Sequence, residues 1–177
     1  MKPTLKIVLI GLFSGLLVVL QVALAPLPNI ELVTFLMLMY TLFLPFSMSI
    51  LIVLVFVTLE MLTWGMGDWV IGYYWIWLVW IGLVYTLKPI LKQNHFSWAL
   101  LSGFWGILFG MLFAINHGFF YGFKFSLIYW IKGISFDIIH TISNYIIVLV
   151  LFKPTYILLE KLLERNGDPH ENHNQDR

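Results

Sequence analysis

The sequence contains no cysteine and few charged residues. Without cysteine there is no disulfide bond, no thiolate metal ligand and no cysteine nucleophile. Only 11% of the 177 residues are charged, whereas 60% are hydrophobic and 18% aromatic, which leaves too little polar surface to cover a soluble globule of this size. The net charge is +1 and the basic residues are dispersed, which argues against a nucleic-acid interface. The composition therefore predicts an integral membrane protein.

Recognisable catalytic motifs are absent as well. The chain has no GxSxG, no HExxH and no glycine-rich phosphate loop. We therefore expect a non-catalytic membrane subunit that uses no cofactor and holds no metal ion. Because the chain has no ATPase motif, active transport would require separate ATPase subunits.

The apolar runs predict an all-α fold with six transmembrane helices in one bundle, at about 20 residues per crossing. Pro45 interrupts the second and third runs, since proline removes a helical donor, and predicts a tight hairpin. Asp68 is expected to be the N-cap of the fourth helix, and the long sixth helix is expected to tilt or protrude. The spans are predicted near residues 5 to 25, 31 to 45, 47 to 63, 69 to 87, 97 to 115 and 126 to 152.

The beginning of the chain superficially imitates a secretory signal, with lysines, an apolar run and small residues at Ala23-Leu24-Ala25. A signal h-region has roughly 7 to 15 apolar residues, and this run is longer. Pro26 would moreover be the first residue after cleavage. We therefore expect this segment to be retained as the first span.

The distribution of basic residues predicts the orientation. Cytoplasmic loops carry an excess of lysine and arginine. A cytoplasmic N-terminus places eight of the ten basic residues in cytoplasmic segments and leaves only Lys124 and Lys132 toward the outside. Both termini are then cytoplasmic, with residues 1–165 as the transmembrane substrate-binding domain and 166–177 as a disordered polar tail. His170 and His173 in this tail admit a weak metal-binding interpretation, to which we prefer a plain polar extension.

Four acids lie in or beside the apolar spans, and the predicted topology brings them into the external half of the membrane. Charged residues inside a bilayer are costly and usually mark a function. The first external loop holds Asn29, the region of the second holds Trp69, and the third is expected to hold His117, Tyr121 and Lys124. Three loops converging on one mouth predict a binding site there. The four acids are Glu31, Glu60, Asp68 and Asp137.

Aromatic residues are concentrated around the second external loop and the fourth span. Five of the eight tryptophans fall within the 17 residues from Trp64 to Trp80. Part of this group is an interfacial aromatic belt. Tyr73, Trp77 and Trp80 are spaced to share one helix face, which either stacks a flat ring or packs as core. An aromatic cup ringed by polar side chains suits a small polar heterocycle.

The sixth span carries a polar stripe. Asp137, His140 and Asn144 are separated by three and four residues and therefore share one face, which must turn toward the bundle. An aspartate beside an imidazole suits ligand hydrogen bonding, proton relay or mutual satisfaction of the two groups. A small intramembrane enzyme that uses Asp137 and His140 is a further reading, but no substrate-recognition motif supports it.

Small residues mark two helices. Gly11 and Gly15, with Ser14 between them, let another helix approach the first span closely, either within the chain or in a partner subunit. Gly103, Gly106 and Gly110 thin the fifth span, where tight internal packing is the preferred interpretation.

Several of these features together resemble the substrate-binding S-components of energy-coupling factor (ECF) vitamin transporters. They are the length, the six spans, the small residues of the first helix, the Pro28-Asn29-Ile30-Glu31 loop and the aromatic Gly-x-Gly-x-Trp segment. The usual Ala-x-x-x-Ala pattern of that family is replaced here by Gly11 and Gly15.

The resemblance implies a protein of the bacterial plasma membrane that binds a water-soluble vitamin from outside for ATP-driven uptake. Its partners would be a transmembrane scaffold, the T-component, and two ATPase subunits, with Gly11, Ser14 and Gly15 as the docking surface. The ligand contacts would come from the external mouth. The candidate ligand-binding residues are Asn29, Glu31, Glu60, Trp64, Asp68, Trp69, Tyr73, Trp77, His117, Asp137, His140 and Asn144.

The aromatic residues favour a flat ring, so vitamin B6 (pyridoxine) or a hydroxymethylpyrimidine precursor is the first expectation, with pantothenate and cobalamin as alternatives. No arginine precedes Arg165, which disfavours an anion, although Lys124 and Lys132 can serve a carboxylate. The rival class is a structural membrane protein of envelope morphogenesis, similar to MreD. A scaffold of that kind needs no buried acids above an aromatic cup, so the polar mouth favours transport.

Overall fold

The computed structural model describes residues 3–167, with side chains through residue 162. The described chain consists of six α-helices and contains no strand. His170 and His173 of the predicted tail lie outside the described residues. The helices are α1 (Pro3–Leu24), α2 (Val33–Phe43), α3 (Phe46–Trp64), α4 (Asp68–Leu91), α5 (His95–Tyr121) and α6 (Phe123–Gly167).

The helices confirm the prediction of an all-α membrane protein. Five of them are at least 18 residues long and apolar enough to cross a membrane, and together they make this a multi-pass membrane protein. The exception is α2, which has 11 residues. At 1.5 Å per residue it spans about 17 Å, well short of the roughly 30 Å of a hydrocarbon core.

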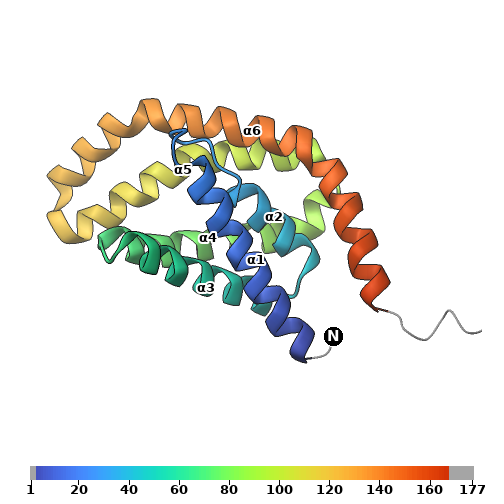
Figure 1. Cartoon of the computed structure of the whole chain (residues 1–177). Coiled ribbons are helices and arrows are strands. Elements are labelled where there is room, and N and C mark those ends of the chain that lie inside the picture. The colour runs from blue at the N-terminus through green and yellow to red at the C-terminus, as the bar shows by residue number, and fades with distance from the viewer. Residues whose placement is uncertain (1–2, 168–177) are drawn as a thin grey trace, which may run out of the picture.

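The arrangement of the helices places α2 and α4 in the interior (Figure 1). The long helices α5 and α6 run side by side along the upper edge of this view, α3 lies along the lower edge and α1 crosses in front. The start of α1 and the end of α6 both lie toward the lower right.

The short helix α2 is the most deeply buried element. Nine of its 11 residues are buried, including Met37, Leu38 and Met39 at 0–1% exposure. It ends at the predicted hairpin, where Pro45 immediately precedes α3. A helix that packs against protein on nearly all sides needs no polar face, which is why its sequence reads as one continuous apolar run.

The predicted third external loop does not exist. We expected His117, Tyr121 and Lys124 in this loop, but α5 continues to Tyr121 and α6 begins at Phe123. Gly122 alone joins the two helices, at a φ of 85° that favours glycine. The apolar runs end before the helices do, because both helices continue through polar and aromatic residues.

The space beside the glycines of α5 is filled by α6. This agrees with the preferred interpretation, which was tight internal packing. A Cβ placed on Gly106 would lie 2.5 Å from the Thr141 backbone nitrogen, and one on Gly110 would lie 2.1 Å from the Asp137 carboxylate. Backbone approach of this kind requires glycine. The sixth helix is also longer than predicted, because it continues through Pro154 and bends in this region (Figure 1).

We expect Gly106→Ala to destabilise the protein, because the added methyl group meets helix backbone that cannot turn away. Overpacking of this kind typically costs about 1–3 kcal/mol, which corresponds to a fall of several degrees in the melting temperature. Gly82→Ala in α4 is the matched control, since nothing lies within 4 Å of its Cβ position. Thermal unfolding in detergent checks both variants, and equal melting temperatures would contradict the packing described.

Candidate ligand-binding site

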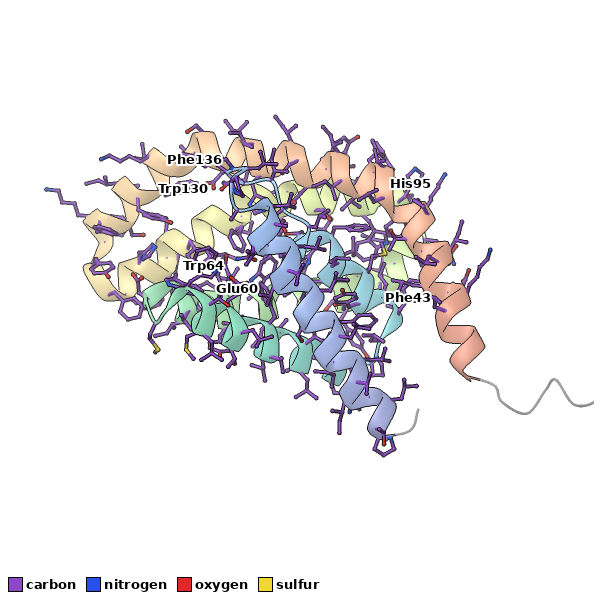
Figure 2. All side chains as sticks on the ribbon, viewed as in Figure 1. Phe43, Glu60, Trp64, His95, Trp130 and Phe136 are labelled. Carbon is purple, nitrogen blue, oxygen red and sulfur yellow. The ribbon has the colours of Figure 1, made fainter. Side chains whose placement is uncertain are left out.

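A cavity of about 450 Å³ opens where α1 ends, α3 ends and α4 begins, beneath the loop of residues 25–32. We call it the main cavity. Phe109 of α5 and His140 of α6 complete its lining. Eight of the 12 predicted ligand-binding residues line it, namely Asn29, Glu31, Glu60, Trp64, Trp69, Tyr73, Trp77 and His140. Figure 2 labels Glu60 and Trp64 near the end of α3.

One wall of the main cavity is a continuous row of aromatic rings. Trp69 meets Tyr73 edge-on with ring centroids 5.3 Å apart, and Tyr73 meets Trp77 at 6.1 Å. Phe109 continues the row at 5.2 Å from Trp77 and at 5.3 Å from His140. Edge-to-face contacts hold such rings in fixed orientations. The wall therefore offers rigid, largely apolar surface to a flat ligand.

The Gly-x-Gly-x-Trp segment positions the first ring of this wall. A Cβ on Gly67 would lie 2.6 Å from Cδ1 of Trp69, so the indole folds back over a position where only glycine leaves room. Gly65 ends α3 with a φ of 87°, again a conformation that favours glycine. The two glycines thus turn the chain from α3 into α4 and place Trp69 against the cavity.

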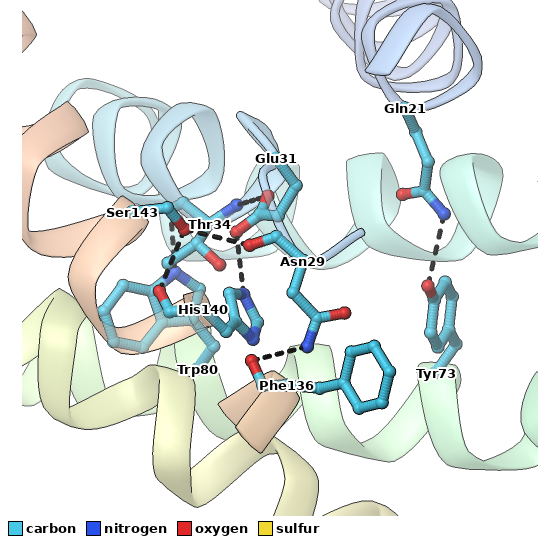
Figure 3. A network of polar contacts seen from close by, with 9 residues as sticks. All are labelled: Gln21, Asn29, Glu31, Thr34, Tyr73, Trp80, Phe136, His140 and Ser143. Atoms are coloured by element: carbon cyan, nitrogen blue, oxygen red, sulfur yellow. Dashed lines mark hydrogen bonds and ion pairs between the residues drawn. The ribbon is translucent and has the colours of Figure 1, made fainter. Parts of the chain in front are cut away.

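Opposite the rings, Gln21 of α1 links α3 to α4. Its Nε2 donates to Oε2 of Glu60 and to the hydroxyl of Tyr73, each at 3.2 Å (the second bond is drawn in Figure 3). Glu60 is completely buried, and its other oxygen, Oε1, has no hydrogen-bond partner. The main cavity is thus lined by a buried carboxylate that is fixed on one side and unsatisfied on the other.

The loop of residues 25–32 is tied to α6 by a polar network (Figure 3). Oε1 of Glu31 lies 3.1 Å from Nε2 of His140, and Oε2 accepts a hydrogen bond of 2.8 Å from the Thr34 amide. Burial raises the pKa of Glu31, but the hydrogen bonds and charge of its partners outweigh this effect and hold the pKa below its ordinary value. Glu31 therefore acts as an ionised anchor of the loop.

Asn29 adds two further ties to α6. Its Nδ2 donates to the Phe136 carbonyl at 2.8 Å, and its own carbonyl accepts from Ser143 Oγ at 2.9 Å (Figure 3). Asn29 has a φ of 57°, in the left-handed region that asparagine tolerates better than most residues. The loop is consequently held in one conformation over the main cavity by both its side chains and its backbone.

Asp68 and His117 do not line the main cavity. Asp68 is the first residue of α4 rather than its N-cap, which is Gly67. Instead its Oδ2 lies 2.8 Å from Nδ1 of His117, near the end of α5. Asn116 donates to the Asp68 carbonyl at 3.1 Å. These contacts form a polar clamp between the start of α4 and the end of α5.

We expect Asp68→Asn to lower the melting temperature, since the carboxylate holds α4 to α5, and to leave ligand affinity within about threefold of wild type. A partly exposed charged pair contributes about 1 kcal/mol. The stability loss should be smaller in a His117→Gln background, because only the Tyr121 hydroxyl then remains as a side-chain partner of Asp68. Thermal unfolding and ligand titration of the single and double variants check this. A tenfold loss of affinity in Asp68→Asn would return Asp68 to the binding site.

Asp137 and Asn144 also lie away from the main cavity. Asp137 lines a second cavity of about 560 Å³ between α5 and α6, and its Oδ2 is buried without a hydrogen-bond partner. Both amide atoms of Asn144 are likewise unpaired and buried. The predicted pairing of Asp137 with His140 is replaced by the contact between His140 and Glu31. Helical spacing placed these side chains on one face but could not show which neighbour each would meet.

The structure decides the role of Trp80, which the sequence left open between ring stacking and core packing, and it adds two residues to the main cavity. Trp80 is fully buried and donates to the Thr34 carbonyl at 3.1 Å, so it belongs to the core (Figure 3). Gln21 and Phe109, which line the main cavity, were not among the predicted site residues. Gln21 is the only polar side chain in α1 after Ser14, and that isolation was a usable signal.

The predicted docking residues divide between two faces of α1. Ser14 is buried and donates to the Ile52 carbonyl of α3 at 3.1 Å. Gly11 and Gly15 face outward instead, with nothing within 4 Å of their Cβ positions. Ile7, Leu12 and Val19 are 61–71% exposed. The outer face of α1 therefore combines exposed apolar side chains with two glycines, Gly11 and Gly15, that have no side chain to keep another helix away.

Comparisons with known proteins assign no family to this chain. No protein-family model, curated protein or solved structure matches the chain significantly. In the described part of the chain, no group of three or more histidine, aspartate and glutamate side chains is arranged to hold a metal ion. Fold and site thus define an all-helical, multi-pass membrane protein with a polar and aromatic cavity beneath one loop.

Proposed function

We propose that this chain is the substrate-binding S-component of an ECF-type vitamin transporter in a bacterial plasma membrane. The observation that carries the proposal is the main cavity, where an aromatic wall faces Glu60, whose Oε1 is buried without a partner. An unsatisfied buried group costs free energy that a bound ligand can recover. A structural scaffold similar to MreD gains nothing from such a site.

The size of the main cavity and its lining favour a small aromatic vitamin. A volume of about 450 Å³ lies in the lower part of the range for small-molecule pockets, which is about 300–1,000 Å³. It suits a single substituted ring such as pyridoxine or hydroxymethylpyrimidine and is small for the macrocycle of cobalamin. The ring wall from Trp69 to Phe109 likewise favours a flat ligand over the aliphatic chain of pantothenate.

The outer face of α1 supports a membrane partner. Gly11 and Gly15 are open to the outside, and small residues let a second helix approach the backbone closely. We infer that this face meets the T-component, which couples the chain to two ATPase subunits. Ser14 supports the same surface from beneath through its bond to α3.

We expect Gly11→Leu with Gly15→Leu to reduce the scaffold and ATPases that co-purify with the chain at least tenfold, because two isobutyl groups block close helix approach. Ligand binding should persist, since neither glycine lines the main cavity. Gly133→Leu is the matched control, as its Cβ position is equally open and lies on α6. Affinity purification from cells that co-express an ECF module measures the effect. An unchanged yield, or envelope-morphogenesis proteins in place of the module, would contradict the proposal.

A further inference from the structure

The two carboxylates that line the main cavity differ in how they are satisfied. Glu31 meets His140 at one oxygen and the Thr34 amide at the other. Glu60 has only neutral donors beside it, the amide of Gln21 at Oε2 and the indole of Trp64. Its Oε1 is buried, and the whole residue has no exposed surface. An ionised carboxylate in such a place is costly unless a cation and a hydrogen-bond donor reach it.

No basic side chain of the cavity supplies that cation. Among the described residues that line the main cavity, none is lysine or arginine. His140, the only imidazole there, is engaged with Glu31. Lys132 lines the second cavity instead. Even if His140 is protonated, the lining with both carboxylates ionised retains a net negative charge.

The opposite wall is suited to a cation as well. Trp69, Tyr73 and Trp77 present aromatic rings to the cavity, and the faces of indole and phenol rings attract positive charge. Trp77 is 2% exposed, and its Nε1 lacks a hydrogen-bond partner. Two residues that line the cavity thus have a buried polar atom without a partner, the acceptor Oε1 of Glu60 and the donor Nε1 of Trp77.

We propose that the main cavity selects a flat aromatic ring that carries a positively charged nitrogen, with Glu60 as its counter-ion. The ligand donates an N–H to Glu60 Oε1, and an oxygen or nitrogen acceptor on the ring accepts from Trp77 Nε1. Gln21 is the positioning residue, because its shared bonds to Glu60 and Tyr73 fix the carboxylate. This inference rests on the proposed function and narrows its substrate class. We expect the cavity to exclude anions and to bind neutral rings more weakly than cationic ones.

Matched ligands that differ in one ring substituent, and so in charge or basicity, test the inference. Pyridoxamine, pyridoxine and 4-pyridoxate share one ring and carry an ammonium, a hydroxyl and a carboxylate at the same position. A second pair is 4-amino-5-hydroxymethyl-2-methylpyrimidine, a weak base whose ring nitrogen takes up a proton beside a carboxylate, and its 4-hydroxy analogue, which is not basic. Each is titrated at pH 7 by isothermal calorimetry into the full-length protein in detergent. The readout is the ratio of dissociation constants within a set, which a general loss of folded protein does not change.

For wild type we expect the amino member of at least one set to bind roughly tenfold or more tightly than its hydroxyl partner, with no detectable binding of 4-pyridoxate. In Glu60→Gln the ratio should fall to about one, because the amide keeps the size of the side chain and loses its charge. Glu160→Gln, which removes a carboxylate from the far end of α6, should keep the wild-type ratio.

Two results overturn the inference in distinguishable ways. If a ligand binds but neutral and cationic members do so equally, or if Glu60→Gln keeps the wild-type ratio, the charge selection is wrong and the vitamin-binding function stands. If no member of either set binds, and pantothenate and cobalamin also fail, the proposed function itself fails. Gln21→Leu tests whether Gln21 only positions Glu60 and does not contact the ligand. It should reduce the ratio of dissociation constants less than Glu60→Gln does.

Discussion

Trp69→Ala is expected to weaken ligand binding by roughly thirtyfold or more. The indole stands at the open end of the ring wall, 5.3 Å from Tyr73, and is only partly buried. Its removal takes away one stacking surface for a flat ligand together with the apolar area that the ligand covers. Aromatic contacts contribute about 0.5–1.5 kcal/mol and a cation over a ring contributes up to about 2 kcal/mol. A loss of about 2 kcal/mol corresponds to the stated factor.

Three controls make this result specific. Trp69→Phe should retain most of the affinity, because a ring still completes the wall. Trp130→Ala removes a tryptophan that lines only the second cavity, and it should leave the affinity unchanged. Gly67→Ala should weaken binding as Trp69→Ala does, because the added methyl group displaces the indole. Calorimetric titration measures all four variants, and equal losses in Trp69→Ala and Trp130→Ala would contradict the assigned site.

Glu31→Ala is expected to destabilise the protein by about 2–3 kcal/mol and to abolish detectable ligand binding. The substitution leaves His140 without its hydrogen-bond partner in a site where only 6% of the imidazole side chain is exposed. It also removes the acceptor of the Thr34 amide at the start of α2. Breaking charged, buried hydrogen bonds has costs of this order. Because the loop of residues 25–32 covers the main cavity, releasing it removes both a wall and the fixed position of Asn29.

The double-variant cycle with His140→Ala separates this contact from other effects. If Glu31 and His140 act through each other, the double variant is less destabilised than the sum of the two single variants. Glu160→Ala serves as a control for loss of one carboxylate. Thermal unfolding in detergent should show a fall of roughly 5–10 °C for Glu31→Ala. Strict additivity in the cycle would show that the contact contributes nothing.

The same contact predicts how the stability depends on pH. The pKa of Glu31 in the folded protein is held below its ordinary value of 4.5, so the ionised form stabilises the fold. This contribution is complete above pH 4.5 and is lost as the pH falls through the lowered pKa. The stability difference between wild type and Glu31→Gln should therefore be constant from pH 6 to 7 and should shrink below pH 4.5. A difference that grows on acidification would contradict the assigned direction.

The fold was largely predictable because the lengths of the apolar runs, and the prolines that interrupt them, determine where membrane helices lie. The hairpin at Pro45 and the first helix, α1, followed directly from these signals. The α5–α6 connection could not be predicted in this way, because hydropathy falls near His117 while the helix continues to Tyr121. The limits of α2 were predicted to within two residues at each end.

The site was predictable where the chain itself brings residues together. Helical periodicity placed Tyr73 and Trp77 on one face of α4, and both line the main cavity. Trp69, four residues before Tyr73, continues this wall, whereas Trp80 of the predicted face packs in the core. Partners from distant helices were not predictable in the same way. Thus His140 meets Glu31, 109 positions away, and not Asp137 in the preceding turn.

Native mass spectrometry of the purified chain, with identification of small molecules released from it, tests the central claim that the main cavity binds a vitamin. The account predicts one ring-containing molecule per wild-type chain, bound with a dissociation constant well below micromolar and lost from Trp69→Ala but not from Trp130→Ala. A wild-type chain that releases no small molecule and binds no B6 vitamer, hydroxymethylpyrimidine, pantothenate or cobalamin in titration would contradict it.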